Sequence, residues 1–257
     1  MSQIVNYKVY GEQNKDAIYI LHGVFGMLDN WHYTAKYLSE KYRVITFDAR
    51  NHGKSFHDSD CSYNAMARDL KSLMDFHGDD NAIIIGHSMG GKTSLIFSEL
   101  YPKCLRQLIV IDIAPKAYPA GHLEFIKAFQ SIDFTQLNSR KEADEAFAPY
   151  TPIAPIRQFL LKNIESKSEG GYQLKINIDA LAKQYPAIIG GINLTGKFQG
   201  NMNFIKGEKS GYIKTEDELI ISKLYNNVDF YSVPKAGHWV HADNPEYFLN
   251  LLSKILL

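Results

Sequence analysis

Short apolar runs alternate with longer amphipathic segments along most of this sequence. The apolar runs are rich in β-branched residues, as is typical of buried strands. They predict strands at 17–21, 43–47, 82–85, 105–111, 203–205 and 227–232. The segments between them predict helices at 31–41, 63–77, 90–101, 215–225 and 245–256.

This alternation indicates an α/β fold, because successive parallel strands must be joined by crossover connections, which are usually helices. We therefore expect a mostly parallel central sheet with crossover helices. Residues 4–10 precede this pattern and are predicted to form an antiparallel edge strand.

The pattern changes between Ile113 and about Gly200. Helical segments there are interspersed with aromatic residues and punctuated by prolines at positions 115, 119, 149, 152, 155 and 186. We interpret 114–199 as an inserted, mainly helical cap on a core formed by 1–113 and 200–257. The insertion begins where a strand delivers the chain to the carboxyl edge of the sheet, which is where open α/β sheets bind ligands. A cap there is expected to cover the site and select substrates.

A serine flanked by small residues lies between a predicted strand and a predicted helix. The segment GHSMGG at 86–91 follows the apolar run 82–85, which is the setting of a nucleophile elbow. Such a turn holds the serine at a positive φ, and the nearby glycines give the backbone room for it. We therefore expect Ser88 to be a nucleophile held above the sheet edge.

The same stretch also satisfies a second motif. GHSMGGKT at 86–93 matches the phosphate-binding P-loop pattern, and Asp112 follows an apolar run as a magnesium-binding aspartate would. A nucleotide hydrolase is therefore an alternative. A P-loop explains neither the HG at 22–23 nor the GHWVH at 237–241, so we favour the elbow and place Lys92 in the first turn of a helix.

A serine nucleophile needs a base, and we expect His238 to supply it. His238 follows the last predicted strand in a loop that can reach the carboxyl edge, whereas His241 lies nearer the last helix and is expected to face solvent or cap structure. The third member must be a buried carboxylate that orients the imidazole. Its usual position, after the penultimate strand, holds Ser210. Asp112, one strand earlier, is therefore the expected acid, and Glu208 is the alternative.

Ser210 receives an accessory role in this hypothesis. A hydroxyl at the acid's usual position can hydrogen-bond to Asp112 or His238 and orient them. The alternative is an ordinary loop serine beside Gly211, because serine is a frequent turn residue.

An acyl transfer also needs N–H donors for the oxyanion. HGVFG at 22–26 directly follows the strand 17–21, where a loop of this kind supplies one donor. We expect Val24 and Met89 to be the two donors, with Phe25 in reserve. His22 is interpreted as a structural hydrogen-bonding residue.

Composition and charge narrow the classes of protein further. With 257 residues, 45% hydrophobic and 22% charged, the chain can bury a full core and suits one larger α/β domain. Basic and acidic residues number 28 each, so we expect neither nucleic acid nor an anionic membrane as the main partner. Cys61 and Cys104 form no CxxC motif, and no signal-like or spanning segment is present, so we expect a cytoplasmic protein.

The motifs HGVFG, DARNHGKS, GHSMGGK, VIDIAP and AGHWVHA, in this order and spacing, resemble the α/β-hydrolase superfamily over nearly the whole chain. Within it, the chain is similar to the YbfF-like bacterial esterases. Shared features are the lysine after GHSMGG, the aspartate of DIAP, QFLLKN, QYP and the serine at the usual acid position. The resemblance implies a serine hydrolase of carboxylic esters and acyl-CoA thioesters, without metal or organic cofactor. Its triad would be Ser88, Asp112 and His238, with Ser210 as an accessory.

The expected partner is a small acyl ester or acyl-CoA, contacted by Phe25, Tyr185 and Trp239. The cap aromatics at 125, 129, 147 and 159 are further candidates, with the core of the cap as their alternative location. A cofactor-free haloperoxidase or a carbon–carbon hydrolase would share the triad. A non-catalytic ligand-binding protein of the same fold is the alternative from another class.

Overall fold

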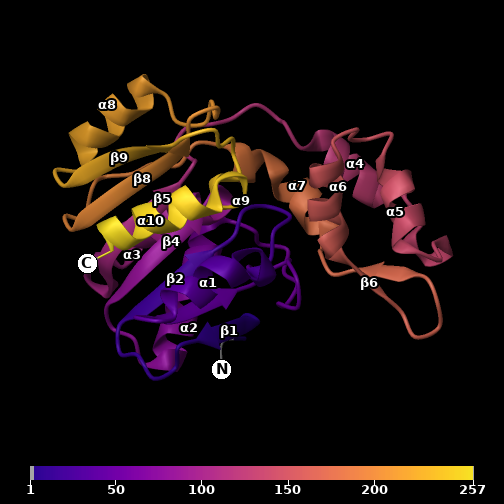
Figure 1. Cartoon of the computed structure of the whole chain (residues 1–257), viewed down its shortest axis with the longest axis horizontal. Coiled ribbons are helices and arrows are strands. Elements are labelled where there is room, and N and C mark those ends of the chain that lie inside the picture. The colour runs from indigo at the N-terminus through magenta and orange to yellow at the C-terminus, as the bar shows by residue number, and fades with distance from the viewer. Residues whose placement is uncertain (1–2, 257) are drawn as a thin grey trace.

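The computed structural model describes residues 3–256, and a seven-stranded sheet in the order β1-β3-β2-β4-β5-β8-β9 forms its centre (Figure 1). The strands are β1 (Tyr7–Tyr10), β2 (Ala17–Leu21), β3 (Arg43–Phe47), β4 (Ala82–His87), β5 (Leu105–Ile111), β8 (Asn201–Gly207) and β9 (Val228–Val233). β1 pairs antiparallel with β3, and the other neighbours pair in parallel. The mostly parallel sheet and its antiparallel edge strand are as predicted.

The helices of the core lie where the pattern predicts them, except for α9, which was not predicted. They are α1 (His32–Leu38), α2 (Tyr63–His77), α3 (Met89–Leu100), α8 (Thr215–Leu224), the short α9 (Val240–Asp243) and α10 (Pro245–Ile255). α1 is shorter than expected at both ends, because Trp31 belongs to a preceding 3-10 turn, Leu28–Trp31, and the helix ends at Leu38 in a turn. β8 is longer than expected, since its polar ends are paired with β5 and β9.

Helices cover both faces of the sheet, and the strands divide their side chains accordingly. On β2, Tyr19 and Leu21 join the apolar core beneath α2, α3 and α8, whereas Ile18 and Ile20 join the core beneath α1, α9 and α10. Figure 1 shows α10, in yellow, crossing the sheet on the viewer's side. Because both faces are covered, only the edges and ends of the strands remain to form a site.

The chain between β5 and β8 forms a mainly helical lobe, which we propose as the cap, residues 114–199. It contains α4 (Leu123–Ser131), α5 (Arg140–Phe147), α6 (Ala154–Leu160), α7 (Ile178–Ile189) and a hairpin of β6 (Ile164–Ser166) and β7 (Tyr172–Leu174). In Figure 1, α4, α5 and α6 lie to one side of the sheet, and α7 is nearer to it. The pattern did not predict the hairpin, although Gly170 and Gly171 form its turn with positive φ.

The apolar core of the cap is continuous with the carboxyl edge of the sheet. Phe129, Phe147 and other buried cap residues pack in one cluster with Val24, Phe25 and Met89. The cap is therefore seated on the loops that follow β2 and β4. Among residues 3–256, no helix is both long and apolar enough to cross a membrane.

Candidate active site

Ser88 and Asp112 lie at the carboxyl ends of the neighbouring strands β4 and β5, and His238 lies in the loop after β9. Ser88 is the single residue between β4 and α3, and Asp112 directly follows β5. The Ser88 N–H donates to the Ile111 carbonyl (3.0 Å), and the Asp112 N–H donates to the Ile205 carbonyl (2.8 Å). Each turn is thereby hydrogen-bonded to the end of the adjacent strand.

Backbone strain is concentrated at this edge of the sheet. Five non-glycine residues of the described chain have positive φ, namely Phe25 (60°), Asn51 (66°), Ser88 (52°), Asp112 (49°) and Lys235 (63°). The strained elbow predicted at Ser88 is therefore present, and Phe25 and Asp112 are strained beside it. Such conformations cost on the order of 1–3 kcal/mol each and persist where surrounding structure imposes them, often at active sites.

The Asp112 carboxylate is completely buried and accepts three hydrogen bonds. His238 Nδ1 lies 2.7 Å from Oδ2, and because a carboxylate only accepts, Nδ1 carries the proton. The Ser210 hydroxyl donates to the same oxygen (2.5 Å), and the Gly207 N–H donates to Oδ1 (3.1 Å). This arrangement leaves Nε2 of His238 as the basic nitrogen. Glu208, the alternative acid, is exposed and accepts the Lys235 N–H instead (2.7 Å).

Two residues that the sequence did not single out hold His238 in place. The ring of Tyr212 stacks on the His238 imidazole, with centroids 3.8 Å apart and planes at 17°. His87 Nε2 lies 2.9 Å from the His238 carbonyl oxygen and donates to it. Burial, with the nearby His238 and His241, lowers the pKa of His87 well below its usual value. His87 directly precedes Ser88 in the sequence, and that adjacency was the available signal for its role.

Ser88 and His238 line one cavity of about 710 Å³ between the core and the cap. Within residues 3–256 the Ser88 hydroxyl makes no hydrogen bond, so the serine and the imidazole share the cavity without being bonded to each other. Hydrogen bonds between a nucleophile and its base are often loose before substrate binds. The placement suits proton transfer once an acyl group occupies the cavity.

The N–H groups expected to bind an oxyanion are free of competing acceptors. Within the described residues, the Val24 N–H makes no hydrogen bond, and Met89 is the first residue of α3, where an N–H has no partner in the helix. The Phe25 N–H points elsewhere, since it donates to His52 Nε2 (3.3 Å). Val24 and Met89 therefore remain the candidate donors. Phe25, the alternative donor, is excluded because its N–H is already bonded.

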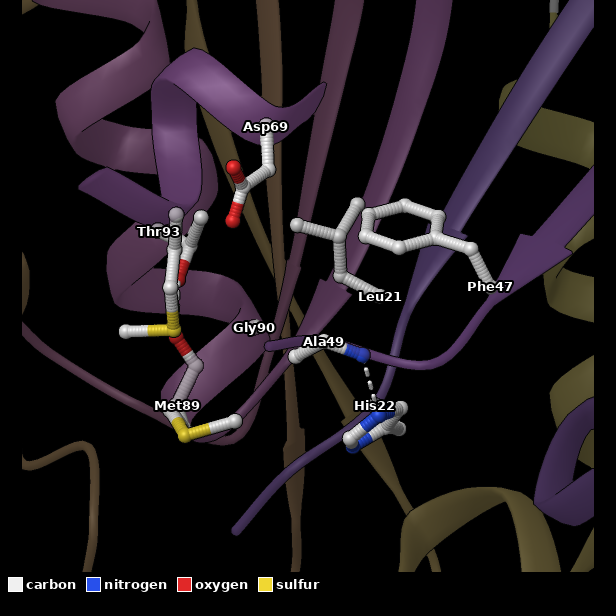
Figure 2. Close-up of a pocket in the computed structure, with 9 residues that line it drawn as sticks. Leu21, His22, Phe47, Ala49, Asp69, Met89, Gly90 and Thr93 are labelled. Atoms are coloured by element: carbon white, nitrogen blue, oxygen red, sulfur yellow. Dashed lines mark hydrogen bonds between the residues drawn. The ribbon is translucent and has the colours of Figure 1, made fainter. Parts of the chain in front are cut away.

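His22 is a structural residue, as expected. Its Nδ1 donates to the Gly23 carbonyl (2.7 Å), and its Nε2 accepts the Ala49 N–H (2.9 Å, Figure 2). Burial lowers the pKa of His22 to about 4, so the ring is neutral at pH 7. The small void of about 10 Å³ above it, bordered by Leu21 and Met89 in Figure 2, has room for about one water molecule.

The residues expected to contact substrate are placed unequally. Phe25 and Trp239 line the cavity, together with Phe125 and Phe159 of the cap. Tyr185 does not line it, which corrects our expectation. The Tyr185 hydroxyl is bonded to the His122 N–H (2.9 Å), so Tyr185 lies behind a histidine that faces the cavity. Phe129 and Phe147, by contrast, are buried in the core of the cap.

His241 was expected to face solvent or to cap the neighbouring structure, and this expectation was wrong. Its ring stacks on Trp31, with centroids 4.1 Å apart and planes at 22°, and it lines the same cavity as His238. α9 starts at the fully buried Val240, which turns His241 toward Trp31 instead of outward. Burial and the neighbouring His238 lower the pKa of His241 to about 3.

The P-loop interpretation does not agree with the structure. Only Ser88 separates β4 from α3, so there is no loop that could surround a phosphate. Lys92 lies in the first turn of α3, as expected, but its side chain is buried and its Nζ donates to the Gly190 carbonyl (2.6 Å). The lysine is therefore engaged by the cap.

A family model described as the alpha/beta hydrolase fold matches residues 16–245, so the chain belongs to this family. It is 34% identical over 254 residues to sn-1-specific diacylglycerol lipase ABHD11 of Mus musculus, covering 96% of this chain and 82% of that protein. It is 32% identical over 246 residues to Esterase YbfF of Escherichia coli K12, covering 95% and 94%. A structure titled marine microorganism esterase superposes with a TM-score of 0.95 at 37% identity, covering 99% of this chain and 100% of that one. The predicted fold and the resemblance to esterases are both confirmed.

Proposed function

We propose that this protein is a serine hydrolase of carboxylic esters, with Ser88 as nucleophile, His238 as base and Asp112 as the acid that orients His238. The observation that carries the proposal is the hydrogen bond from His238 to the buried Asp112, in a cavity that also contains Ser88. The names of the relatives, two esterases and a diacylglycerol lipase, support ester hydrolysis.

The chemistry follows from the geometry. His238 Nε2 takes the proton of Ser88 as its oxygen attacks the acyl carbon, and the carbonyl oxygen gathers negative charge near the N–H groups of Val24 and Met89. The imidazolium gives its proton to the leaving alcohol, while Asp112 stabilises the positive charge. Water activated by His238 then attacks the acyl-enzyme and releases the carboxylic acid product from Ser88.

We extend the proposal to acyl-CoA thioesters. A thioester differs from an ester in its leaving group, and the acyl-enzyme formed on Ser88 would be the same. Lys162 lines the 710 Å³ cavity and supplies a cation for an anionic leaving group. A panel of acyl-CoA substrates, followed by thiol release, tests this part separately from oxygen esters.

The first experiment is the pre-steady-state release of p-nitrophenol from short-chain esters, with no metal or nucleotide added. We expect a burst equal to the enzyme concentration from the wild type and none from Ser88→Ala. Substitution of Ser88 or His238 by alanine should each lower kcat by on the order of 10⁴-fold or more, and the double variant should lose no more than either.

Ser222→Ala is the matched control, because Ser222 is exposed on α8, away from the cavity. Its burst should equal that of the wild type. Additive losses at Ser88 and His238 would contradict a coupled pair. Ligand binding without turnover by the wild type would favour the non-catalytic binding protein.

A further inference from the structure

Two segments connect the cap to the core, and together we call them the neck: 114–118 enters the cap and 189–197 leaves it. Two backbone hydrogen bonds join the segments, from the Tyr118 N–H to the Ile189 carbonyl (2.9 Å) and from the Ile192 N–H to the Pro115 carbonyl (2.8 Å). The neck therefore behaves as one unit, and its position relative to α3 sets where the cap begins.

Lys92 of α3 contacts both segments of the neck. Its Nζ donates to the carbonyls of Gly190 (2.6 Å) and Ile189 (3.4 Å) and lies 5.0 Å from the centre of the Tyr118 ring. These carbonyls end α7, where a cation is favoured by the unpaired carbonyl groups and the helix dipole. Burial lowers the pKa of Lys92 to about 8, so the side chain is still mainly an ammonium at pH 7.

Glu99 holds the outgoing segment at a second point. It follows Lys92 by two turns of α3, so both side chains project from the same face of the helix. Its carboxylate accepts the Thr195 hydroxyl (2.5 Å) and the N–H groups of Gly196 (2.9 Å) and Lys197 (3.4 Å). Burial raises the pKa of Glu99, but these hydrogen bonds outweigh it and hold the pKa below its usual value. α3 thus binds the segment 189–197 at two points. Lys92 binds backbone carbonyls at the start of the segment, and Glu99 binds backbone N–H groups near its end.

The neck closes a small pocket beside the nucleophile. This pocket, of about 30 Å³, is bordered on the core side by Val24, Ser88 and Met89, and on the other side by Tyr118 and residues 188–189. The side chain of Lys92 also lines it. None of the neck residues lines the larger cavity, so the neck limits space only on the side of the proposed oxyanion donors.

We propose that Lys92 is a positioning residue that restricts the enzyme to short acyl chains by holding the neck against the nucleophile helix. This inference rests on the proposed function. The acyl group of the substrate occupies the small pocket. The depth of this pocket is fixed by the distance between α3 and the end of α7. When the ammonium is removed, the two carbonyls lose their donor, the neck moves away from α3 and the pocket deepens.

The test compares Lys92→Met, which keeps the length and apolar stem of the side chain, with Lys183→Met, an exposed lysine on α7. The measured quantity is kcat/KM for p-nitrophenyl acetate, butyrate, hexanoate and octanoate. In Lys92→Met the ratio of octanoate to acetate should rise about tenfold, the size of effect that one or two methylene groups produce in an apolar pocket. Lys183→Met should keep the wild-type ratio.

Glu99→Gln provides a second variant, because it weakens the other attachment without placing a new group in the pocket. It should shift the profile in the same direction by a smaller factor. A uniform loss on all four esters in both variants would mean a structural role only and would overturn the proposal.

Amide hydrogen exchange in 114–118 and 189–197 gives a readout that needs no turnover. Exchange should be faster in Lys92→Met than in Lys183→Met. If the wild type hydrolyses none of the esters, the proposed function fails, whereas the exchange data still test the attachment of the neck. Unchanged exchange, or faster exchange with an unchanged acyl profile, would contradict the role given to Lys92.

Discussion

At the scale of single residues, the candidate site differs from the usual arrangement in the strand that carries its proposed acid. Asp112 follows β5, and the position expected for the acid holds Ser210, whose hydroxyl donates to the Asp112 carboxylate. The two side chains therefore reach one point from adjacent strands, β5 and β8. Asp112 and Ser210 form one hydrogen-bonded unit with His238.

We predict that Ser210→Ala lowers kcat by about tenfold and leaves KM nearly unchanged, because one charge-assisted hydrogen bond to Asp112 is lost while its bonds to His238 and Gly207 remain. Asp112→Asn should cost on the order of 10⁴-fold, since it disturbs the tautomer of His238. Steady-state kinetics on one ester measure both, with Ser222→Ala as control. Turnover by Ser210→Ala at the wild-type rate would retire its accessory role.

Residue identities in the candidate site were predictable where a turn or a strand end restricts them. Ser88, Asp112 and His238 each follow a strand, so chain order and the sheet edge were enough to bring them together. Tyr185 and His241 were misplaced for the opposite reason. Their orientation depends on contacts with His122 and Trp31, which are distant in sequence and leave no local pattern.

At the scale of elements, the close approach of α3 to β2 fixes the position of Ser88 relative to the edge of the sheet. A Cβ on Gly90 would lie 2.6 Å from the Leu21 carbonyl oxygen and 2.7 Å from that of His22, so only glycine fits there. The elbow therefore depends on a packing requirement as well as on the strained turn at Ser88.

We predict that Gly90→Ala lowers the free energy of unfolding by about 2–5 kcal/mol, because the methyl group would force α3 away from backbone atoms that cannot yield. Gly121→Ala is the control, since a Cβ there meets no atom within 4 Å and the φ of Gly121 is not positive. Urea unfolding measures both. Equal stability of the two variants would show that α3 can shift without penalty.

The elements of the core were largely predictable because strands and helices have different apolar periods. The cap was predicted only as mainly helical. Its hairpin consists of two three-residue strands, too short to produce an alternating pattern. The packing of the cap on the core depends on buried charges such as Lys92 and Glu99, and charged residues in a sequence normally indicate an exposed surface.

At the scale of the whole molecule, folding keeps several histidines neutral. Burial lowers the pKa of four of them from 6.5 to about 3 or 4, namely His22, His52, His122 and His241. Between pH 6.5 and about 4 the unfolded chain binds protons on these rings that the folded chain excludes. The free energy of unfolding should therefore fall as the pH is lowered through this range.

We predict a measurable loss of stability between pH 7 and pH 5 in urea unfolding, and a shallower loss in His241→Phe. Phenylalanine keeps an aromatic ring against Trp31 but removes one imidazole whose pKa is lowered by folding, so the slope should decrease by up to about 1.4 kcal/mol per pH unit. Carboxylates held below their usual pKa, such as Glu99, are the same in both proteins and cancel in the comparison. An identical slope would contradict a His241 ring that stays neutral in the folded protein.

Two backbone hydrogen bonds attach Ser88 and Asp112 to the adjacent strands. The residues proposed to carry out the reaction are therefore held by the sheet, apart from the cap residues that line the cavity. Ser88 and Asp112 cannot move apart unless the strands that hold them separate. Part of the cavity wall, including Phe125 and Phe159, belongs to an inserted segment that meets the core through its neck and the loops beneath it. Evolution can therefore remodel or exchange the cap, and with it the range of substrates, while the reaction itself is inherited unchanged.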